Sequence, residues 1–382
     1  MANAATVFEP DAAPESWAAS YAANGYLLVR GLLDPERAIE PLKDSYTSLV
    51  DAMGYVFLSE TLPDALGDYG GQPFPLRFAT MLGASGGLAL HHLDPVLNIF
   101  VDHFQYRRDL PTSQIPEVFA CIRHARVLDV LEALLGPEVL ASPIYHVNVK
   151  LAQRHLQEVE SVAKASGQDN PTVERFYNFQ VGKTDWHMDA VSGLSDSHHS
   201  RIANAWIPIT EATPENGCLM VVPGSHTGEV RDPQPEHADV LTERAVTLPM
   251  RPGDVLFLDN KVLHSSTPNT SDADYRFAFN FRYVQAGQTG GRPFLPGFVA
   301  RSRSAPESEL HNPFVWSTMW DRALTYRVKH GVPYSYGALR DGDVSEDQAR
   351  AITEHWRRRA PDPRGWLRLE QTDDAPLPAV SW

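Results

Sequence analysis

Residues 275–283 read Tyr-Arg-Phe-Ala-Phe-Asn-Phe-Arg-Tyr, a strict alternation of aromatic and other side chains. Successive side chains of a β-strand point to opposite faces of the sheet. The two faces carry Phe277, Phe279, Phe281 and Tyr283 on one side, and Arg276, Ala278, Asn280 and Arg282 on the other. We expect the aromatic face to pack against helices and the polar face to look into a cavity. An arginine there requires an anion, either a bound carboxylate or a structural ion-pair partner.

Further strand-like runs lie around this segment from about residue 143 onward, separated by turn residues. They are residues 145–151, 176–181, 202–209, 218–222, 255–258 and 275–284. Regularly spaced short strands of this kind are typical of a β-barrel or β-sandwich. A polar, helix-like insertion at 152–174 interrupts the series. The pattern predicts a mainly β core within an α+β protein.

Helices are expected on either side of this core. Asp34 and Pro35 suit the N-cap and first position of a helix, and Gly136-Pro137 ends an apolar helical pattern over 116–135. The remaining candidates are residues 16–24, 316–330 and 345–359. We expect these helices to form the scaffold rather than the site.

Composition limits the class of protein. The 382 residues include 33 Lys+Arg and 48 Asp+Glu, and the net charge of −15 argues against nucleic-acid or anionic-membrane partners. No apolar run reaches the ~18–20 residues that span a bilayer, and the first residues lack a secretory signal pattern. Two cysteines, Cys121 and Cys218, exclude a disulfide scaffold and a cysteine zinc cluster. We expect a cytoplasmic protein.

Three His-x-Asp triplets, at residues 92–94, 187–189 and 237–239, are candidate metal ligands. Residues i and i+2 of a strand share a face, so both side chains can reach one ion. Two imidazoles and one carboxylate suit Fe(II) and leave adjacent positions open. Because His187 follows Trp186 and a strand-like run, whereas the other two triplets lie in polar loops, we favour His187 and Asp189.

His264 is the natural third ligand. It lies 77 positions after His187, beyond the strand-like run 253–259. Arg276 follows twelve residues later at the start of the alternating strand. This order brings a candidate metal site and a candidate anion site together.

Five motifs precede Arg276 in a fixed order. They are Trp186-His-Met-Asp189, Asn204-Ala-Trp-Ile-Pro-Ile209, Glu215-Asn-Gly-Cys-Leu-Met-Val-Val-Pro-Gly-Ser-His226, Gly253-Asp-Val-Leu-Phe257 and His264-Ser-Ser-Thr-Pro-Asn-Thr-Ser271. The series resembles the phytanoyl-CoA dioxygenase-like family of Fe(II)- and 2-oxoglutarate-dependent oxygenases. The resemblance covers roughly residues 16–290.

The resemblance implies a double-stranded β-helix core, a cupin-like jelly roll flanked by helices. It implies iron held by His187, Asp189 and His264, with O₂ and 2-oxoglutarate as co-substrates. It further implies that Arg276 and Ser266 hold the distal carboxylate of 2-oxoglutarate. A basic residue on the strand before His-x-Asp often helps in this family, and Lys150 and Lys183 both compete for that place.

The resemblance also sets the expected organisation. We predict one oxygenase domain over 1–300, with an N-terminal α/β part at 1–142, the jelly-roll core at 143–290 and the helical insertion at 152–174. Residues 301–382 are expected to form a helical C-terminal extension packed on the same domain. A homodimer through this extension is a further prediction.

The implied reaction is oxidation of an unactivated C–H bond of a small molecule, with succinate and CO₂ as co-products. Because Asp189 is present, oxygen transfer is favoured over halogenation. We expect hydroxylation of a secondary metabolite or an amino-acid-like substrate. The same iron centre could instead catalyse desaturation, ring formation or epimerisation. Two alternatives of another class are a non-catalytic binding protein and a zinc hydrolase using the same ligands.

Overall fold

The computed structural model describes residues 5–69, 71–85, 115–157, 161, 184–193, 195–231, 233–272, 274–291 and 295–330. Within them lie two β-sheets, of seven and three strands, with strand orders β1-β2-β7-β4-β9-β3-β10 and β6-β5-β8. The larger sheet contains β1 (Val7–Phe8), β2 (Tyr26–Val29), β3 (Glu138–Lys150), β4 (Ile202–Pro208), β7 (Val255–Asp259), β9 (Arg276–Gln285) and β10 (Phe298–Ser302). The smaller sheet contains β5 (Leu219–Val221), β6 (Val246–Leu248) and β8 (His264–Ser266).

Strand β9 is the alternating segment, and it lies inside the larger sheet with β3 and β4 as antiparallel neighbours. The β3 register places Lys150 directly opposite Arg276. The β4 register places Asn204 directly opposite Arg282. Since paired residues on one face of a sheet are neighbours, the register gathers these four polar side chains on one surface.

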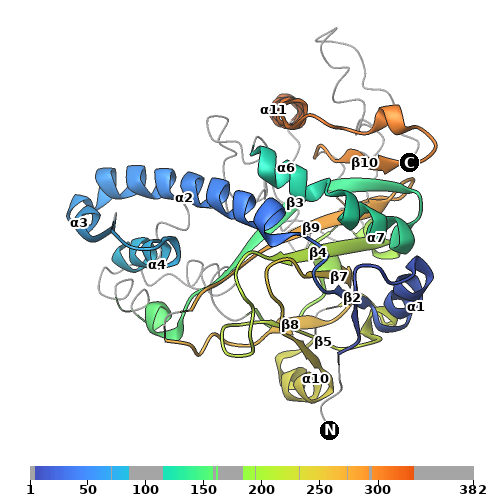
Figure 1. Ribbon diagram of the computed structural model, residues 1–382, viewed down its shortest axis with the longest axis horizontal. Helices are drawn as coiled ribbons and strands as arrows, with labels where there is room; N and C mark the ends of the chain where they lie inside the picture. Colours follow the sequence, from blue (N-terminus) through green and yellow to red (C-terminus); the bar gives the residue numbers. More distant parts are fainter. Residues whose placement is uncertain are drawn as a thin grey trace.

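Helices cover one face of the larger sheet, as Figure 1 shows for α2, α6 and α7. The helices are α1 (Pro14–Asn24), α2 (Glu40–Thr61), α3 (Leu66–Tyr69), α4 (Phe74–Ala84), α6 (Pro116–Ile122), α7 (Ala125–Leu135), α10 (Ala238–Arg244) and α11 (Pro313–His330). The aromatic face of β9 meets this layer edge to face. The ring centroids of Tyr46 and Phe279 are 5.2 Å apart, and those of Phe78 and Phe277 are 5.8 Å apart. The predicted packing of the aromatic face is therefore confirmed.

The smaller sheet lies on the opposite side of the larger one, with α10 beside it (Figure 1). A second apolar cluster fills the space between the sheets and includes Trp206, Leu219 and Ala278. One isolated antiparallel bridge joins His187 to His264 of β8. The polar face of β9 and the His-x-Asp segment therefore lie between the two sheets.

The predicted fold class is confirmed: a core of two facing β-sheets is flanked by helices. The sheets do not close into a barrel within the described ranges. The helix after Asp34 is also confirmed, because the Asp34 side chain accepts hydrogen bonds from the backbone of Glu36 and Arg37. This first turn is a short π-helix, Pro35–Ile39, which leads into α2.

One helix prediction was wrong. Residues 116–135 form two helices, α6 and α7, and not a single one. The chain breaks at Arg123 and at His124, whose backbone is not helical (φ −57°, ψ 125°). The Arg123 side chain donates to the carbonyl of Ala300 and to Glu309. Tertiary context can override a continuous helical pattern.

Several predictions lie outside the described residues. These are the strand at 176–181, the triplet at 92–94, Lys183, most of the 152–174 insertion and the helix at 345–359. The expected domain boundary at residue 300 falls inside β10. Helix α11 begins at Pro313, three residues before the predicted start. No helix in the described ranges is long and apolar enough to cross a bilayer.

Candidate metal centre

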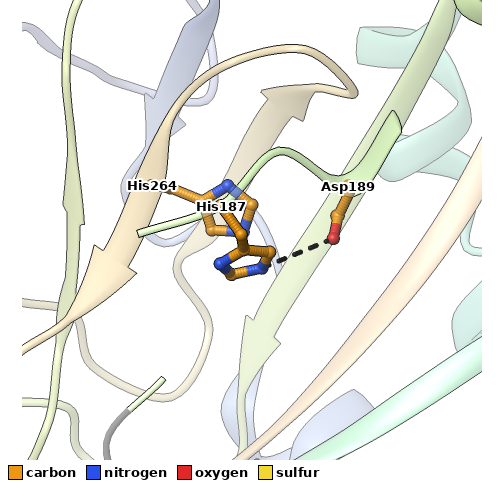
Figure 2. Close-up of side chains that lie close together, drawn as sticks. All are labelled: His187, Asp189 and His264. Atoms are coloured by element: carbon orange, nitrogen blue, oxygen red, sulfur yellow. Dashed lines mark ion pairs between the residues drawn. The ribbon is translucent and has the colours of Figure 1, made fainter. Parts of the chain in front are cut away.

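His187, Asp189 and His264 lie together between the two sheets (Figure 2). One ligand atom from each lies within 4.8 Å of the other two. His187 Nε2 is 3.7 Å from Asp189 Oδ1, and the two imidazole centroids are 4.1 Å apart. The sequence-predicted triad is thus gathered in one place.

The imidazoles are oriented by backbone carbonyls. His187 Nδ1 is 2.8 Å from the carbonyl oxygen of Asp185, and His264 Nδ1 is 3.1 Å from that of Val262. A carbonyl can only accept, so each Nδ1 carries the proton. In the neutral imidazole, each Nε2 then keeps its lone pair, which is the form that ligates a metal. The donor set therefore fits a divalent ion such as Fe(II).

The strand pairing fixes this arrangement. His187 N–H donates to His264 O at 3.0 Å, and His264 N–H donates to His187 O at 3.1 Å. On the far side of the triplet, Ala190 N–H donates to Asn260 O at 2.8 Å. Trp186 packs with Met220, Val222 and Leu241 in a small apolar cluster. The His-x-Asp segment is held at both ends before any ligand binds.

Asp189 is ionised in this setting. Burial alone would raise its pKa, but Arg282, followed by His264 and His187, outweighs burial and lowers the pKa to about 2. Burial and the neighbouring His187 lower the pKa of His264 to about 4. A neutral imidazole beside an ionised carboxylate is the protonation state that metal binding needs.

Arg276 lies at the start of β9 with almost no exposure, 2% of its surface. Its guanidinium carbon is 5.2 Å from the centre of the Trp206 ring. Neither Nε nor Nη1 has a hydrogen-bond partner among the described residues, and no salt bridge to a described carboxylate is present. Burial lowers its pKa to about 9, so it stays protonated at neutral pH. A buried, unsatisfied cation of this kind calls for an anionic ligand.

Lys150 is opposite Arg276 and equally buried, at 2% exposure. Its Nζ donates to Thr184 Oγ1 at 3.2 Å. The backbone N–H of Thr184 in turn donates to Ser266 Oγ at 3.3 Å. Ser266, two residues beyond His264 on β8, is fully buried. Thr184 thus connects Lys150 of the larger sheet to Ser266 of the smaller one.

Other sequence candidates lie elsewhere. His237 and Asp239 are exposed at the start of α10 and take no part in the site. His226 is buried, and its Nε2 is 3.1 Å from the carbonyl oxygen of Ala22, so it ties its loop to α1. His199 is exposed.

Sequence reasoning missed Asn204 as a site residue. Asn204 Nδ2 donates to Asp189 Oδ2 at 2.7 Å, and Arg282 Nη2 is 3.6 Å from the same oxygen. Arg282 was placed on the polar face of its strand without a role. The strand register, which pairs the two residues, was the missing signal.

Comparison with known proteins identifies the family. The sequence model of phytanoyl-CoA dioxygenase (PhyH) matches residues 21–278, well over half of the chain. The chain belongs to the phytanoyl-CoA dioxygenase family. The predicted family is confirmed.

Among curated proteins, phytanoyl-CoA dioxygenase domain-containing protein 1 of Rattus norvegicus is 30% identical over 158 residues, 36% of this chain and 54% of that protein. The homologue from Dictyostelium discoideum is 33% identical over 95 residues, 21% of this chain and 34% of that protein. The chain thus spans about half, or less, of the length of the curated relatives that it matches.

Similar solved structures are more distant. The epimerase SnoN in complex with Fe3+, alpha ketoglutarate and nogalamycin RO is 18% identical, with a TM-score of 0.42 over 74% of this chain and 89% of that one. EvdO2 from Micromonospora carbonacea var. aurantiaca, complexed with 2-oxoglutarate, is 18% identical, with a TM-score of 0.43 over 76% and 96%. Likeness at this level gives no information on the substrate or reaction of this chain.

Proposed function

We propose that the protein is an Fe(II)- and 2-oxoglutarate-dependent dioxygenase that oxidises a C–H bond of a small molecule. One observation carries the proposal. A set of two imidazoles and one carboxylate lies between the same two sheets as a buried arginine whose Nε and Nη1 lack hydrogen-bond partners among the described residues. This arrangement supports a metal site and a dicarboxylate site between the same two sheets.

His187 Nε2, Asp189 Oδ1 and His264 Nε2 would hold the iron. Three protein ligands leave adjacent positions for the co-substrate and O₂. When bound, the iron supplies the oxidising chemistry, with 2-oxoglutarate and O₂ converted to succinate and CO₂ as one oxygen atom enters the substrate. The carbonyls of Asp185 and Val262 keep both imidazoles in the ligating tautomer.

Arg276 would bind the distal carboxylate of 2-oxoglutarate, because two of its buried nitrogens are free to donate. Ser266 would contribute its hydroxyl from the opposing sheet. Of the two competing lysines, Lys150 is the one that we assign to this co-substrate, since it is opposite Arg276 on the neighbouring strand.

We take hydroxylation of a secondary metabolite or amino-acid-like molecule as the reaction, within a single oxygenase domain at residues 1–300. Desaturation, ring formation and epimerisation use the same centre. Product mass distinguishes gain of an oxygen atom from loss of two hydrogens.

Anaerobic absorption spectroscopy tests the proposal. Wild-type protein with Fe(II) should develop a weak visible charge-transfer band when 2-oxoglutarate is added. His187→Ala and Arg276→Ala should lose the band. His237→Ala, which removes an exposed histidine from another His-x-Asp triplet, should keep it. Folded wild-type protein without a band would contradict the proposal and favour the zinc or binding-protein alternatives.

A further inference from the structure

The two oxygens of the Asp189 carboxylate have different surroundings. Oδ1 is 3.7 Å from His187 Nε2 and faces the other candidate ligands (Figure 2). Oδ2 accepts a hydrogen bond from Asn204 Nδ2 at 2.7 Å. The same oxygen is 3.6 Å from Arg282 Nη2. One oxygen is therefore committed to the protein, and the other is left for a metal.

Arg282 fixes which way the Asn204 amide points. Arg282 Nε donates to Asn204 Oδ1 at 3.0 Å. Because a guanidinium has donors only, the amide oxygen must face Arg282, and the amide nitrogen must face Asp189. Asn204 and Arg282 are directly opposite each other on β4 and β9, with 1% and 5% exposure. The larger sheet itself holds this chain of donors in place.

We propose that Asn204 and Arg282 are positioning residues that hold Asp189 as a one-oxygen metal ligand. This inference rests on the proposed function and adds residues to it. A carboxylate free to rotate could offer both oxygens and occupy a further coordination position. With Oδ2 held by Asn204 and Arg282, the positions needed by 2-oxoglutarate and O₂ stay open.

The two buried arginines of β9 therefore have separate roles. Arg276 has unsatisfied donors and no described carboxylate beside it. Arg282, six residues further along the same face, is already paired with Asp189 and Asn204. Arg282 is consequently not available as a second anion site, and its charge serves the ligand carboxylate.

Anaerobic titration of the full-length apoprotein with Fe(II) alone, followed by calorimetry, tests this inference. Asn204→Ala and the bulkier, apolar Asn204→Leu both remove the donor, and the leucine leaves less of a cavity. Tyr283→Phe is the matched control, because Tyr283 is adjacent to Arg282 on β9 but donates to Ile122 O in the helical layer at 2.8 Å. Tyr283→Phe removes a buried hydrogen bond but no contact of Asp189.

We expect the Fe(II) dissociation constant to rise about 10- to 100-fold in both Asn204 variants. Tyr283→Phe should unfold at a lower temperature yet bind Fe(II) as the wild type does. Wild-type affinity in Asn204→Leu, or an equal loss in Tyr283→Phe, would overturn the inference alone. Wild-type protein that fails to bind Fe(II) would overturn the proposed function and this inference with it.

Discussion

At the scale of single residues, the role proposed for Arg276 in co-substrate binding would come at a cost in the stability of the apoprotein. Its guanidinium is buried against Trp206, and two of its nitrogens lack partners in the described structure. Unsatisfied buried donors each cost about 1–3 kcal/mol. Replacing an uncompensated buried charge by an apolar side chain of similar size is often stabilising. Arg276 should therefore lower the stability of the apoprotein.

Arg276→Met should raise the unfolding midpoint of the apoprotein and weaken 2-oxoglutarate binding by about 100-fold or more, because the distal carboxylate would lose its charged partner. Thermal unfolding and 2-oxoglutarate titration of the Fe(II) form measure the two effects. Arg282→Met is the matched control, since Arg282 is paired with Asp189. It should lower the apoprotein midpoint. A lower midpoint for Arg276→Met as well would contradict the argument.

Gly217 lies against Lys150, the lysine that we assign to the proposed co-substrate site. Its φ is +101°, a conformation that disfavours any side chain. A Cβ there would lie 3.1 Å from Lys150 Cγ and 3.3 Å from Thr267 O. Glycine thus lets the loop before β5 pack directly on the lysine side chain.

Gly217→Ala should destabilise the protein by about 1–2 kcal/mol through backbone strain, and should also weaken 2-oxoglutarate binding by displacing Lys150. Gly287→Ala is the control: φ is +83°, and nothing lies within 4 Å of a Cβ at that position. Gly287→Ala should lower the stability of the protein and leave its 2-oxoglutarate affinity unchanged. Chemical denaturation gives the first quantity and co-substrate titration the second. Unchanged co-substrate affinity in Gly217→Ala would remove Lys150 from the proposed site.

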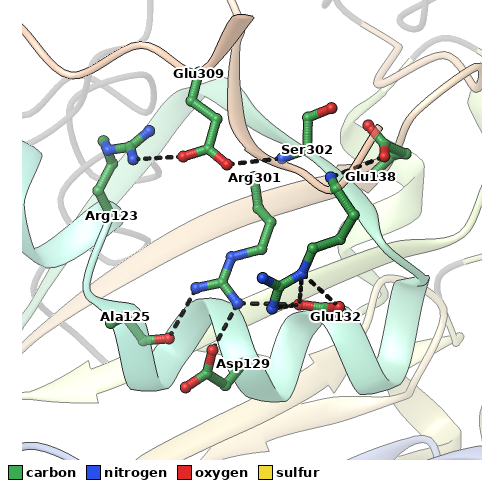
Figure 3. Close-up of polar contacts among 9 residues, drawn as sticks. Arg123, Ala125, Asp129, Glu132, Glu138, Arg301, Ser302 and Glu309 are labelled. Carbon is green, nitrogen blue, oxygen red and sulfur yellow. Dashed lines mark hydrogen bonds and ion pairs between the residues drawn. The ribbon is translucent and has the colours of Figure 1, made fainter. Parts of the chain in front are cut away.

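At the scale of elements, a cluster of ion pairs fastens β10 to α7 (Figure 3). Arg303 Nη2 is 2.6 Å from Glu132 Oε2, and Arg301 Nη1 is 3.0 Å from the same oxygen. Glu309, just beyond β10, pairs with Arg123 at 3.0 Å and accepts from the backbone of Ser302. These contacts connect the edge of the larger sheet to the segment that leads into α11.

This cluster should make the edge sensitive to acid. The hydrogen bond from Arg303 lowers the pKa of Glu132 below its usual 4.5. For Glu309, burial raises the pKa, but the Ser302 backbone and Arg123 outweigh it, so the pKa is lowered. A carboxylate with a lowered folded-state pKa stabilises fully above its unfolded-state value, and the stabilisation is lost as pH falls through the folded-state value.

Thermal unfolding from pH 6 down to about pH 3 tests this, with the midpoint expected to fall below the unfolded-state pKa of the two carboxylates. Glu132→Gln should lower the midpoint at pH 6 and flatten the pH dependence. Glu211→Gln, which breaks an exposed pair with Arg251, should leave both unchanged. An equally steep dependence in Glu132→Gln would show that the acid sensitivity arises elsewhere.

Elements differ in how well their sequence predicts them. The alternation in β9 predicts both of its faces, because strand periodicity is local and the aromatic rings have only one apolar layer to meet. At the break between α6 and α7, the Arg123 side chain bonds to Glu309 and to the Ala300 carbonyl, about 180 residues away. Local patterns do not contain such contacts.

At the scale of the whole molecule, the same distinction applies to the site. The order of motifs was enough to select His187 and His264 from fifteen histidines, with Asp189 beside them, and to point to Arg276. It could not choose between the competing lysines, because the choice depends on β3 pairing with β9 in one register. Asn204 was missed for the same reason, since its partner is fixed only by the pairing of β4 with β9.

The proposed ligands would connect the two sheets. His264 and Ser266 belong to the smaller sheet, whereas Arg276 and Lys150 belong to the larger one. A ligand that binds only the folded state stabilises it by about 2.7 kcal/mol at 100 times its dissociation constant. Because unfolding must separate the sheets, this stabilisation should appear in the global transition and not only in local loops.

Fe(II) with 2-oxoglutarate, added anaerobically to wild-type protein, should therefore raise the unfolding midpoint by a few degrees, at about 1–2 °C per kcal/mol for a chain of 382 residues. In Arg276→Met, the rise in midpoint caused by Fe(II) should remain, and the rise caused by 2-oxoglutarate should be lost. Glutarate, a dicarboxylate of equal length without the keto group, should give less than 2-oxoglutarate because it cannot chelate the metal. Equal shifts from the two acids would mean that the dicarboxylate binds at Arg276 without reaching the metal centre.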